Sequence, residues 1–135
     1  MKLALISCGK YKRAGCHMAK DLYISNRFRL AWDYAKRTHD AVLILSAKHG
    51  LLDPYRFIRS YDTKLNDISH ANREKWAQKV AREICDYSPD DAEVTFLAGK
   101  MYTEFVVDLL GKRQVATPLK GLRQGEQLQW LKNKI

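Results

Sequence analysis

The sequence predicts a single α/β domain over residues 1–135, with three layers around a mostly parallel, Rossmann-like sheet of about four strands. Three observations predict this fold class. Short apolar runs alternate along the chain with longer segments of helical periodicity. The first three runs lack polar alternation, which is typical of parallel strands that are buried on both faces. A length of 135 residues suits one domain.

The strands are expected at the apolar runs. These are residues 3–6, 41–45, 94–97 and 115–116, of which the last is short and weak. Because helical segments separate the runs, each connection is expected to be a right-handed crossover between parallel strands. We therefore predict parallel pairing of the strands that begin near Leu3, Ala41 and Val94.

Helices are expected where apolar residues recur at steps of three or four. Ser25 is placed to cap the first of these helices and Ser69 the second. A third helix is expected over residues 102–110 and a fourth around residues 128–131. Residues 50–68 lack a clean period, so we expect a long irregular loop there, and such loops are more often functional than idle.

The charge balance favours a polyanionic partner. Lys and Arg number 24 against 15 Asp and Glu, a net charge of +9. This excess suits a nucleotide or a nucleic acid, with DNA favoured over RNA. The alternative is that the charge only aids solubility.

The cysteines and the apolar runs predict the cellular compartment. Three cysteines cannot all pair within one chain, and no signal peptide is expected because polar residues interrupt the first apolar run. The longest run is far shorter than the ~20 residues of a membrane span. We therefore expect a cytoplasmic protein with reduced thiols and no membrane partner.

Three strand ends share small residues followed by a lysine. They read Ser7-Cys8-Gly9-Lys10, Ser46-Ala47-Lys48-His49 and Ala98-Gly99-Lys100. Ligands of open α/β sheets bind at the carboxyl edge, where small residues let backbone N–H groups approach an anion. We expect a site for a phosphate or an oxyanion there, in which Lys10 and Lys48 bind the same ligand. The residues of this predicted site are Ser7, Gly9, Lys10, Ser46, Lys48, Gly99 and Lys100. The alternative is that strand-to-helix turns need small residues anyway.

Other motifs narrow the chemistry. Neither GxxxxGK[ST] nor GxGxxG is present, which disfavours ATP hydrolysis and dinucleotide oxidoreduction. Gly121 and Gly125 open the last helix, and that loop could lie against a sugar or phosphate, or only allow close helix packing. Cys8 and Cys16 do not have zinc-site spacing. We expect neither a metal site nor a cofactor.

Acid–base and nucleophilic candidates are few. Asp62 or His49 could handle a proton or stabilise a cationic sugar centre, although Asp62 could also only close a turn. Cys8 could be a nucleophile near lysines, or a small residue packed under its loop. Tyr23 or Tyr61 could stack on a base, and Ser25 is also expected to bind the ligand.

The motifs resemble a small, largely uncharacterised bacterial and phage family of standalone domains. The resemblance rests on Leu5-Ile6-Ser7-Cys8-Gly9-Lys10-x-Lys12, Leu22-Tyr23-x-Ser25-x-x-Phe28, Leu45-Ser46-Ala47-Lys48-His49-Gly50-Leu51 and Gln127-Leu128-x-Trp130-Leu131. More remotely, the first motif with Tyr23 and Ser25 resembles the uracil-DNA-glycosylase-like domain of archaeosine synthase. The chain is also similar to the YaaA peroxide-stress proteins.

These resemblances imply a protein whose substrate or ligand is a nucleobase or DNA. The water-activating aspartate motif of uracil glycosylases has no match in the chain. We expect a nucleotide- or nucleic-acid-directed enzyme, acting at an N-glycosidic bond as a glycosylase or a base or ribosyl transferase. The alternative is a non-catalytic DNA- or RNA-binding accessory protein of phage or bacterial origin.

Overall fold

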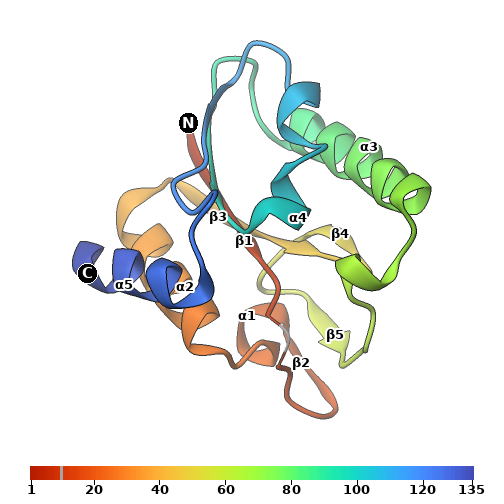
Figure 1. Cartoon of the computed structure of the whole chain (residues 1–135), viewed down its shortest axis with the longest axis vertical. Helices are drawn as coiled ribbons and strands as arrows, with labels where there is room; N and C mark the ends of the chain where they lie inside the picture. The colour runs from red at the N-terminus through yellow and green to blue at the C-terminus, as the bar shows by residue number, and fades with distance from the viewer. Residues whose placement is uncertain (10) are drawn as a thin grey trace.

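A five-stranded, mostly parallel sheet forms the centre of a mixed α/β fold (Figure 1). The computed structural model describes residues 1–9 and 11–135, apart from the side chain at position 66. The strand order is β4-β3-β1-β6-β7. The strands are β1 (Lys2–Ser7), β3 (Ala41–Ser46), β4 (Gly50–Leu52), β6 (Glu93–Leu97) and β7 (Gln114–Ala116).

The three central strands pair in parallel, which confirms the pairing predicted from the apolar runs. On β1, Leu5 lies opposite Leu43 of β3 on one side and Phe96 of β6 on the other. All three side chains are buried. Strands covered on both faces have no solvent side to alternate with, so their sequence is continuously apolar.

The sheet has one strand more than the roughly four expected from the apolar runs. The extra strand is β4, which pairs antiparallel with β3 after a turn at residues 47–49, and its first residue, Gly50, has a φ of +72°. A second, two-stranded sheet pairs β2 (Cys16–Met18) with β5 (Phe57–Arg59). Strands of three residues are too short to show a period, which is why residues 50–68 resembled an irregular loop.

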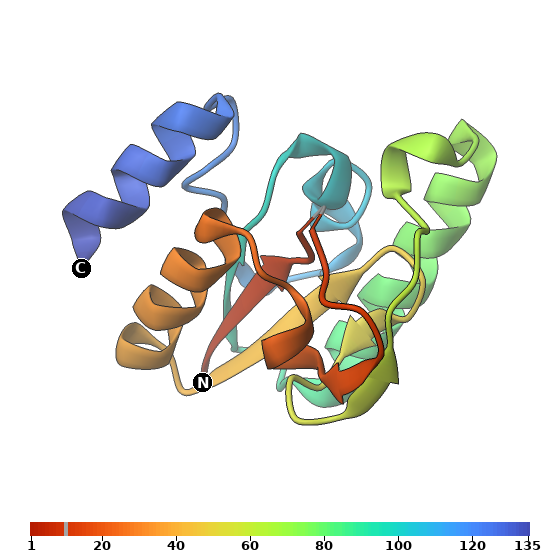
Figure 2. The same cartoon turned by 90° about the horizontal axis from the view of Figure 1, so that it is seen from below.

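Helices pack on both faces of the sheet (Figure 2). Ala4 and Ile6 of β1 face α2 (Asn26–Thr38) and α5 (Gln124–Lys134), whereas Leu3 and Leu5 face α3 (His70–Tyr87). Each fully buried leucine or isoleucine side chain of this kind contributes about 1.5–3 kcal/mol through the hydrophobic effect. Within the described part of the chain, no helix combines the length and the apolar character that crossing a membrane requires.

Two predicted helix starts are confirmed and one predicted helix is wrong. The Oγ atoms of Ser25 and Ser69 accept backbone N–H bonds at the starts of α2 and α3. The helix expected over residues 102–110 is replaced by the short helix α4 (Lys100–Thr103) and the 3₁₀ turn η2 (Val107–Leu109). β-Branched residues at Thr103, Val106 and Val107 disfavour a continuous helix, and Val106 N–H bonds back three residues to Thr103.

Candidate functional site

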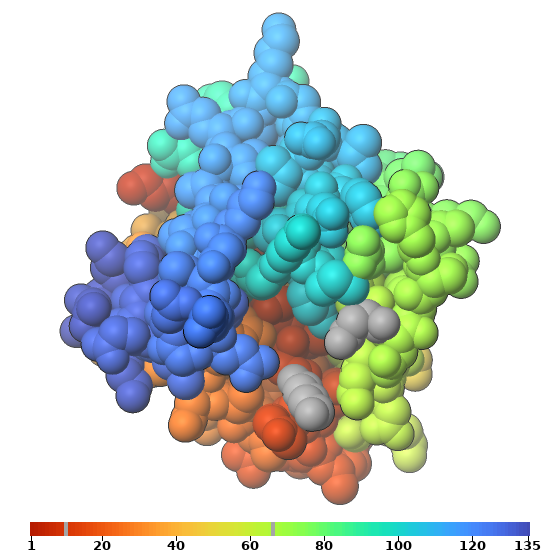
Figure 3. All heavy atoms as spheres, in the orientation of Figure 1, coloured from red at the N-terminus to blue at the C-terminus, as the bar shows by residue number. Residues whose placement is uncertain are grey.

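A pocket of about 590 Å³ opens at the carboxyl edge of the parallel strands, where the end of β1 meets α4 (Figure 3). Its wall draws on the loop after β1, the start of α2, the segment around the 3₁₀ turn η1 (Leu65–Asp67), α4 and the start of α5. The described lining residues are Cys8, Gly9, Tyr11, Lys12, Ser25, Asn26, Arg27, Thr63, Lys64, Asp67, Tyr102, Gln124 and Leu128.

Chain connectivity explains why the pocket lies there. From β1 the chain crosses through α2 to β3 on one side, and from β3 it crosses through α3 to β6 on the other side. At the carboxyl edge, the chain leaves β1 toward α2 on one face of the sheet and leaves β6 toward α4 and η2 on the face that α3 covers, so the two segments diverge between the ends of β1 and β6. Such a divergence point leaves a crevice, and it is where ligands bind in open α/β sheets.

Gly9 brings the β1 loop against the start of α2. A Cβ atom on Gly9 would lie 2.8 Å from the Oγ of Ser25, closer than side chains tolerate. That same Oγ accepts the N–H of Phe28 at 3.2 Å and caps α2. The predicted residues Gly9 and Ser25 therefore lie together in the pocket wall because the loop and the helix cap touch.

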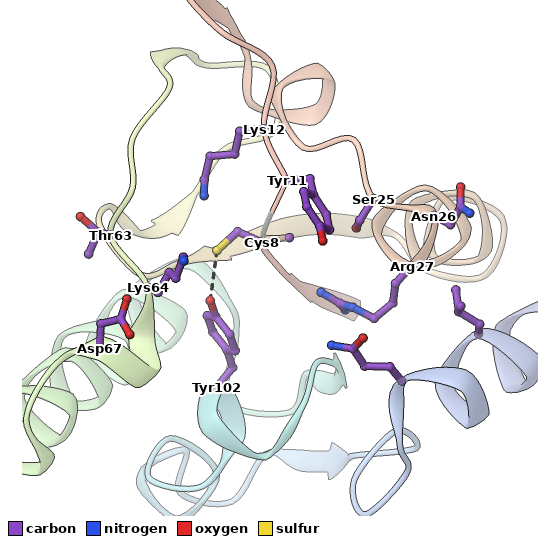
Figure 4. A pocket seen from close by; sticks show the side chains of 13 residues that line it. Cys8, Tyr11, Lys12, Ser25, Asn26, Arg27, Thr63, Lys64, Asp67 and Tyr102 are labelled. Atoms are coloured by element: carbon purple, nitrogen blue, oxygen red, sulfur yellow. Dashed lines mark hydrogen bonds between the residues drawn. The ribbon is translucent and has the colours of Figure 1, made fainter.

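Arg27 points toward Cys8 and Tyr102 inside the pocket (Figure 4). Its Nη2 donates to the backbone oxygen of Ser7 at 3.3 Å. Its Nη1 is buried and has no hydrogen-bond partner among the described residues. Burial lowers the pKa of the Arg27 guanidinium, while Tyr102 and Cys8 act in the opposite direction.

Cys8, directly after β1, and Tyr102, in the helix α4 after β6, form the floor of the pocket (Figure 4). The Sγ of Cys8 lies 3.2 Å from the Oη of Tyr102, and only 7% of Cys8 is exposed. Burial, reinforced by Cys8, raises the pKa of the Tyr102 phenol. Tyr102 therefore stays neutral near pH 7 and keeps a hydroxyl proton to donate.

The charged wall residues make the pocket basic. Lys12, Arg27 and Lys64 outnumber Asp67, the carboxylate among the described lining residues. The Nζ of Lys12 lies 4.5 Å from the ring centroid of Tyr61, a cation–π contact that holds the ammonium beside the pocket. Lys64 and Asp67 are exposed at the rim.

A buried group of hydroxyls closes the neighbouring end of β3; we call Ser46, Tyr23 and Tyr61 the tyrosine cluster. The Oη of Tyr61 lies 2.6 Å from that of Tyr23 and 2.7 Å from the Oγ of Ser46. The Ser46 Oγ also accepts the N–H of His49 at 3.0 Å. Burial raises the pKa of both phenols, so neither ionises near neutral pH.

His49 and Lys48 border the tyrosine cluster and do not line the pocket. The ring of His49 packs edge-on against Tyr61, with 5.5 Å between ring centroids, and its Nε2 is buried without a partner among the described residues. The Nζ of Lys48 lies 5.7 Å from the centroid of the same Tyr61 ring. Burial lowers the pKa of His49, and the cations Arg56, Lys48 and Lys79 lower it further.

The remaining predicted residues lie outside the pocket lining. Asp62 is exposed directly after Tyr61. Gly99 and Lys100 start α4, where the Gly99 oxygen accepts the N–H of Tyr102. Gly121 turns the chain with φ of +81°, and Gly125 follows the lining residue Gln124. Lys10 lies outside the described residues, so its predicted sharing of a ligand with Lys48 stays a prediction.

The sequence analysis did not identify most of the residues that line the pocket. The missed residues are Tyr11, Lys12, Asn26, Arg27, Thr63, Lys64, Asp67, Tyr102, Gln124 and Leu128. One signal could have found Arg27: a basic residue in the first turn of a predicted helix opposes the helix dipole. No group of three or more His, Cys, Asp or Glu residues in the described part of the chain could hold a metal ion.

The comparison with known proteins agrees with the resemblance to a small uncharacterised family. The profile of DUF6884, a family of unknown function, matches residues 3–133. The chain belongs to this family. The uncharacterized protein YfjM of Bacillus subtilis strain 168 is 31% identical over 131 residues, which cover 90% of this chain and 86% of that protein. No solved structure matches the chain significantly.

Proposed function

We propose that this protein is a nucleotide- or nucleic-acid-directed enzyme that acts at an N-glycosidic bond. The observation that carries the proposal is the pocket itself. Its volume of about 590 Å³ and its mixture of cations, phenols and a carboxylate suit a nucleotide. The proposal takes the helices on both faces as a three-layer, Rossmann-like arrangement, whose ligands bind at the point where the crossovers diverge.

Each part of a nucleotide has a complementary group in the pocket. The ammonium of Lys12 and the guanidinium of Arg27 suit phosphate oxygens. The ring of Tyr11 is 61% exposed and lies at the pocket wall, where a base can stack on it. The carboxylate of Asp67 lines the pocket, and its negative charge suits a cationic sugar centre.

The proposed hydrolysis follows from these positions. The bond between C1′ of the sugar and the base nitrogen breaks, and its electron pair leaves with the base. Water then gives its hydroxyl to C1′ and its proton to the base. Asp67 stabilises the positive charge that develops on the sugar. We assign this carboxylate role to Asp67 because it lines the pocket, whereas the sequence suggested Asp62 or His49.

The test is the release of free base from a panel of nucleosides, nucleotides and single-stranded oligonucleotides, followed by chromatography. Asp67→Asn is expected to lower turnover by about 10²-fold or more. Asp62→Asn, at an exposed residue outside the pocket, is the matched control and is expected to keep full turnover. Release of no base from any substrate would overturn the proposal.

Cys8→Ala separates the two roles considered for the thiol. Cys8 is nearly buried and bonds to Tyr102, which suits a packed wall residue. We expect turnover to fall less than 10-fold, since a wall residue adds only positioning. Complete loss of turnover in a folded variant would instead place the sulfur in the reaction as a nucleophile.

A second candidate is non-catalytic binding of nucleic acid. The basic rim, with Lys12 and Lys64, and the net charge of +9 favour it. Binding of labelled single- and double-stranded DNA is expected to weaken steeply as salt rises, because phosphate contacts release counterions. Absence of binding at low salt would exclude nucleic acid as the ligand and leave free nucleotides.

A further inference from the structure

Arg27 occupies a position that is unfavourable without a ligand. It is the second residue of α2, where the positive end of the helix dipole repels a cation. The first turn of α2 contains no acidic residue, whereas the first turn of α5 contains Glu126. Burial also disfavours the charged guanidinium, and Nη1 has no partner among the described residues. These costs fall on one side chain that points into the pocket.

A second arginine in the same protein shows what a structural arginine looks like. Arg113 donates from Nε to the Ser88 Oγ at 3.1 Å, from Nη1 to the Leu110 oxygen at 3.4 Å and from Nη2 to the Ser88 oxygen at 2.8 Å. Every nitrogen of Arg113 therefore has an acceptor. Among the described residues, the Nη2 of Arg27 has an acceptor at the Ser7 backbone oxygen, whereas its buried Nη1 has none.

The groups around Arg27 are complementary to an anion. No carboxylate of the described residues lies within ion-pair distance of Arg27. The Tyr102 hydroxyl is a neutral donor, and Lys12 adds an ammonium on the same pocket wall. A guanidinium with one arm fixed presents its free N–H groups in a set direction, which suits the tetrahedral oxygens of a phosphate.

We propose that Arg27 is the phosphate receptor of the pocket, and that the ligand is a nucleotide with a terminal phosphate monoester. This inference rests on the proposed function for the nucleoside part of the ligand. The Nη2–Ser7 bond orients the guanidinium, Nη1 donates to a phosphate oxygen, and Tyr102 and Lys12 supply the second and third donors. A phosphate monoester carries close to two negative charges at neutral pH, which neutralise the surplus cations of the wall.

The test measures calorimetric binding of inorganic phosphate, a nucleoside and the corresponding 5′-monophosphate to the full chain. We expect the monophosphate to bind at least about 10-fold more tightly than the nucleoside, because it adds charge-assisted hydrogen bonds. Arg27→Gln is expected to remove that difference. Arg29→Gln, at an exposed residue of the same helix, is the matched control and should bind as the wild type does. Circular dichroism and thermal unfolding verify that each variant is folded.

The outcomes separate this inference from the proposed reaction. Monophosphate binding that is unchanged in a folded Arg27→Gln variant overturns the receptor role. Arg27-dependent binding without any release of base leaves the receptor standing and overturns the reaction. Competition by inorganic phosphate supports the receptor, and tighter binding of a 5′-phosphorylated oligonucleotide than of its unphosphorylated form would identify a strand end as its source.

Discussion

The ends of β1 and β3 are neighbours at one edge of the sheet, and the hydroxyls at the end of β3 differ in their hydrogen bonding from the guanidinium of Arg27 beside the end of β1. At the end of β3 the hydroxyls of the tyrosine cluster bond to one another, so each buried oxygen has a partner. At the end of β1, Arg27 keeps a buried nitrogen without a described partner beside an open pocket. Paired buried groups hold a fold together, whereas an unpaired donor beside a cavity is complementary to a ligand.

Lys12 connects the two ends. Its ammonium lies over the ring of Tyr61, in the tyrosine cluster, yet the residue lines the pocket. The segment around Lys12 is also held by the backbone, since the Ile24 N–H donates to the Tyr11 oxygen at 3.0 Å. The tyrosine cluster at the end of β3 therefore positions a cation for the pocket at the end of β1. Substitutions in the cluster and substitutions in the pocket should have distinguishable effects on stability and on ligand binding.

The largest effect is expected from Tyr61→Phe. The change removes the central hydroxyl and leaves Tyr23 and Ser46 without this partner, at a cost of about 1–3 kcal/mol in the free energy of unfolding. The Phe ring still offers Lys12 an aromatic face, so ligand binding in the pocket should persist. Urea unfolding measures the loss. In a cycle with Ser46→Ala, the two losses should not add, because the variants break one shared bond; additive losses would contradict a connected cluster.

A smaller effect is expected from Gly9→Ala. The new methyl group would clash with the Ser25 Oγ and displace the cap of α2, which is worth about 1 kcal/mol. Both stability and ligand binding should fall, because the loop and the cap form the pocket wall. Ser25→Gly costs only a few tenths of a kcal/mol as a cap and should rescue Gly9→Ala.

Gly125→Ala is the matched control for Gly9→Ala. A Cβ atom on Gly125 would meet no heavy atom within 4 Å, and the residue lies in α5. Alanine there is expected to raise stability by about 0.5–1 kcal/mol. If Gly9→Ala were as harmless as this control, the close approach of loop and cap would not matter to the fold.

Arg27→Met should change stability least among these substitutions when no ligand is present. Loss of the Nη2–Ser7 bond costs about 0.5–1.5 kcal/mol, and relief of the cation at the helix start returns about 0.3–1 kcal/mol. The methionine stem retains most of the packing. Thermal unfolding without and with added phosphate measures both quantities: the wild type should gain stability from phosphate and the variant should not. A loss of several kcal/mol without ligand would make Arg27 a structural residue.

Much of the fold followed from local sequence signals. Continuous apolar runs identified the parallel strands, and Ser25 and Ser69 marked helix starts, because these signals lie within a few residues of the structure they specify. The three-residue strands and the broken helix after β6 carried no such signal. Their form depends on tertiary packing, which overrides weak local preference.

The candidate site was predictable in position and not in composition. The carboxyl-edge rule pointed to Cys8 and Gly9, which line the pocket. Tyr102 completes the floor from 94 residues away, and only the arrangement of strands brings it beside Cys8. The sequence also did not predict the directions in which side chains point. Lys48 follows a strand as expected, yet its ammonium lies near the ring of Tyr61, outside the pocket lining.

The smallest expected effect is a pH dependence of the stability of the fold, caused by His49 beside the tyrosine cluster. Burial and nearby cations lower its pKa below the ~6.5 of the unfolded chain, so the unfolded state binds a proton more readily. The stability contributed by neutral His49 is fully present above about pH 6.5 and is lost as the pH falls through the lowered folded pKa. Urea unfolding at about pH 7.5 and about pH 5.5 should show a loss of stability that is smaller than that of Tyr61→Phe.

His49→Gln cannot take up the proton, so its stability should depend less on pH over this window. His39, whose pKa is also lowered chiefly by burial, lies at a distant position, and His39→Gln should remove a separate part of the same loss. Equal pH dependence in His49→Gln and the wild type would show that protonation of His49 contributes nothing to this loss of stability.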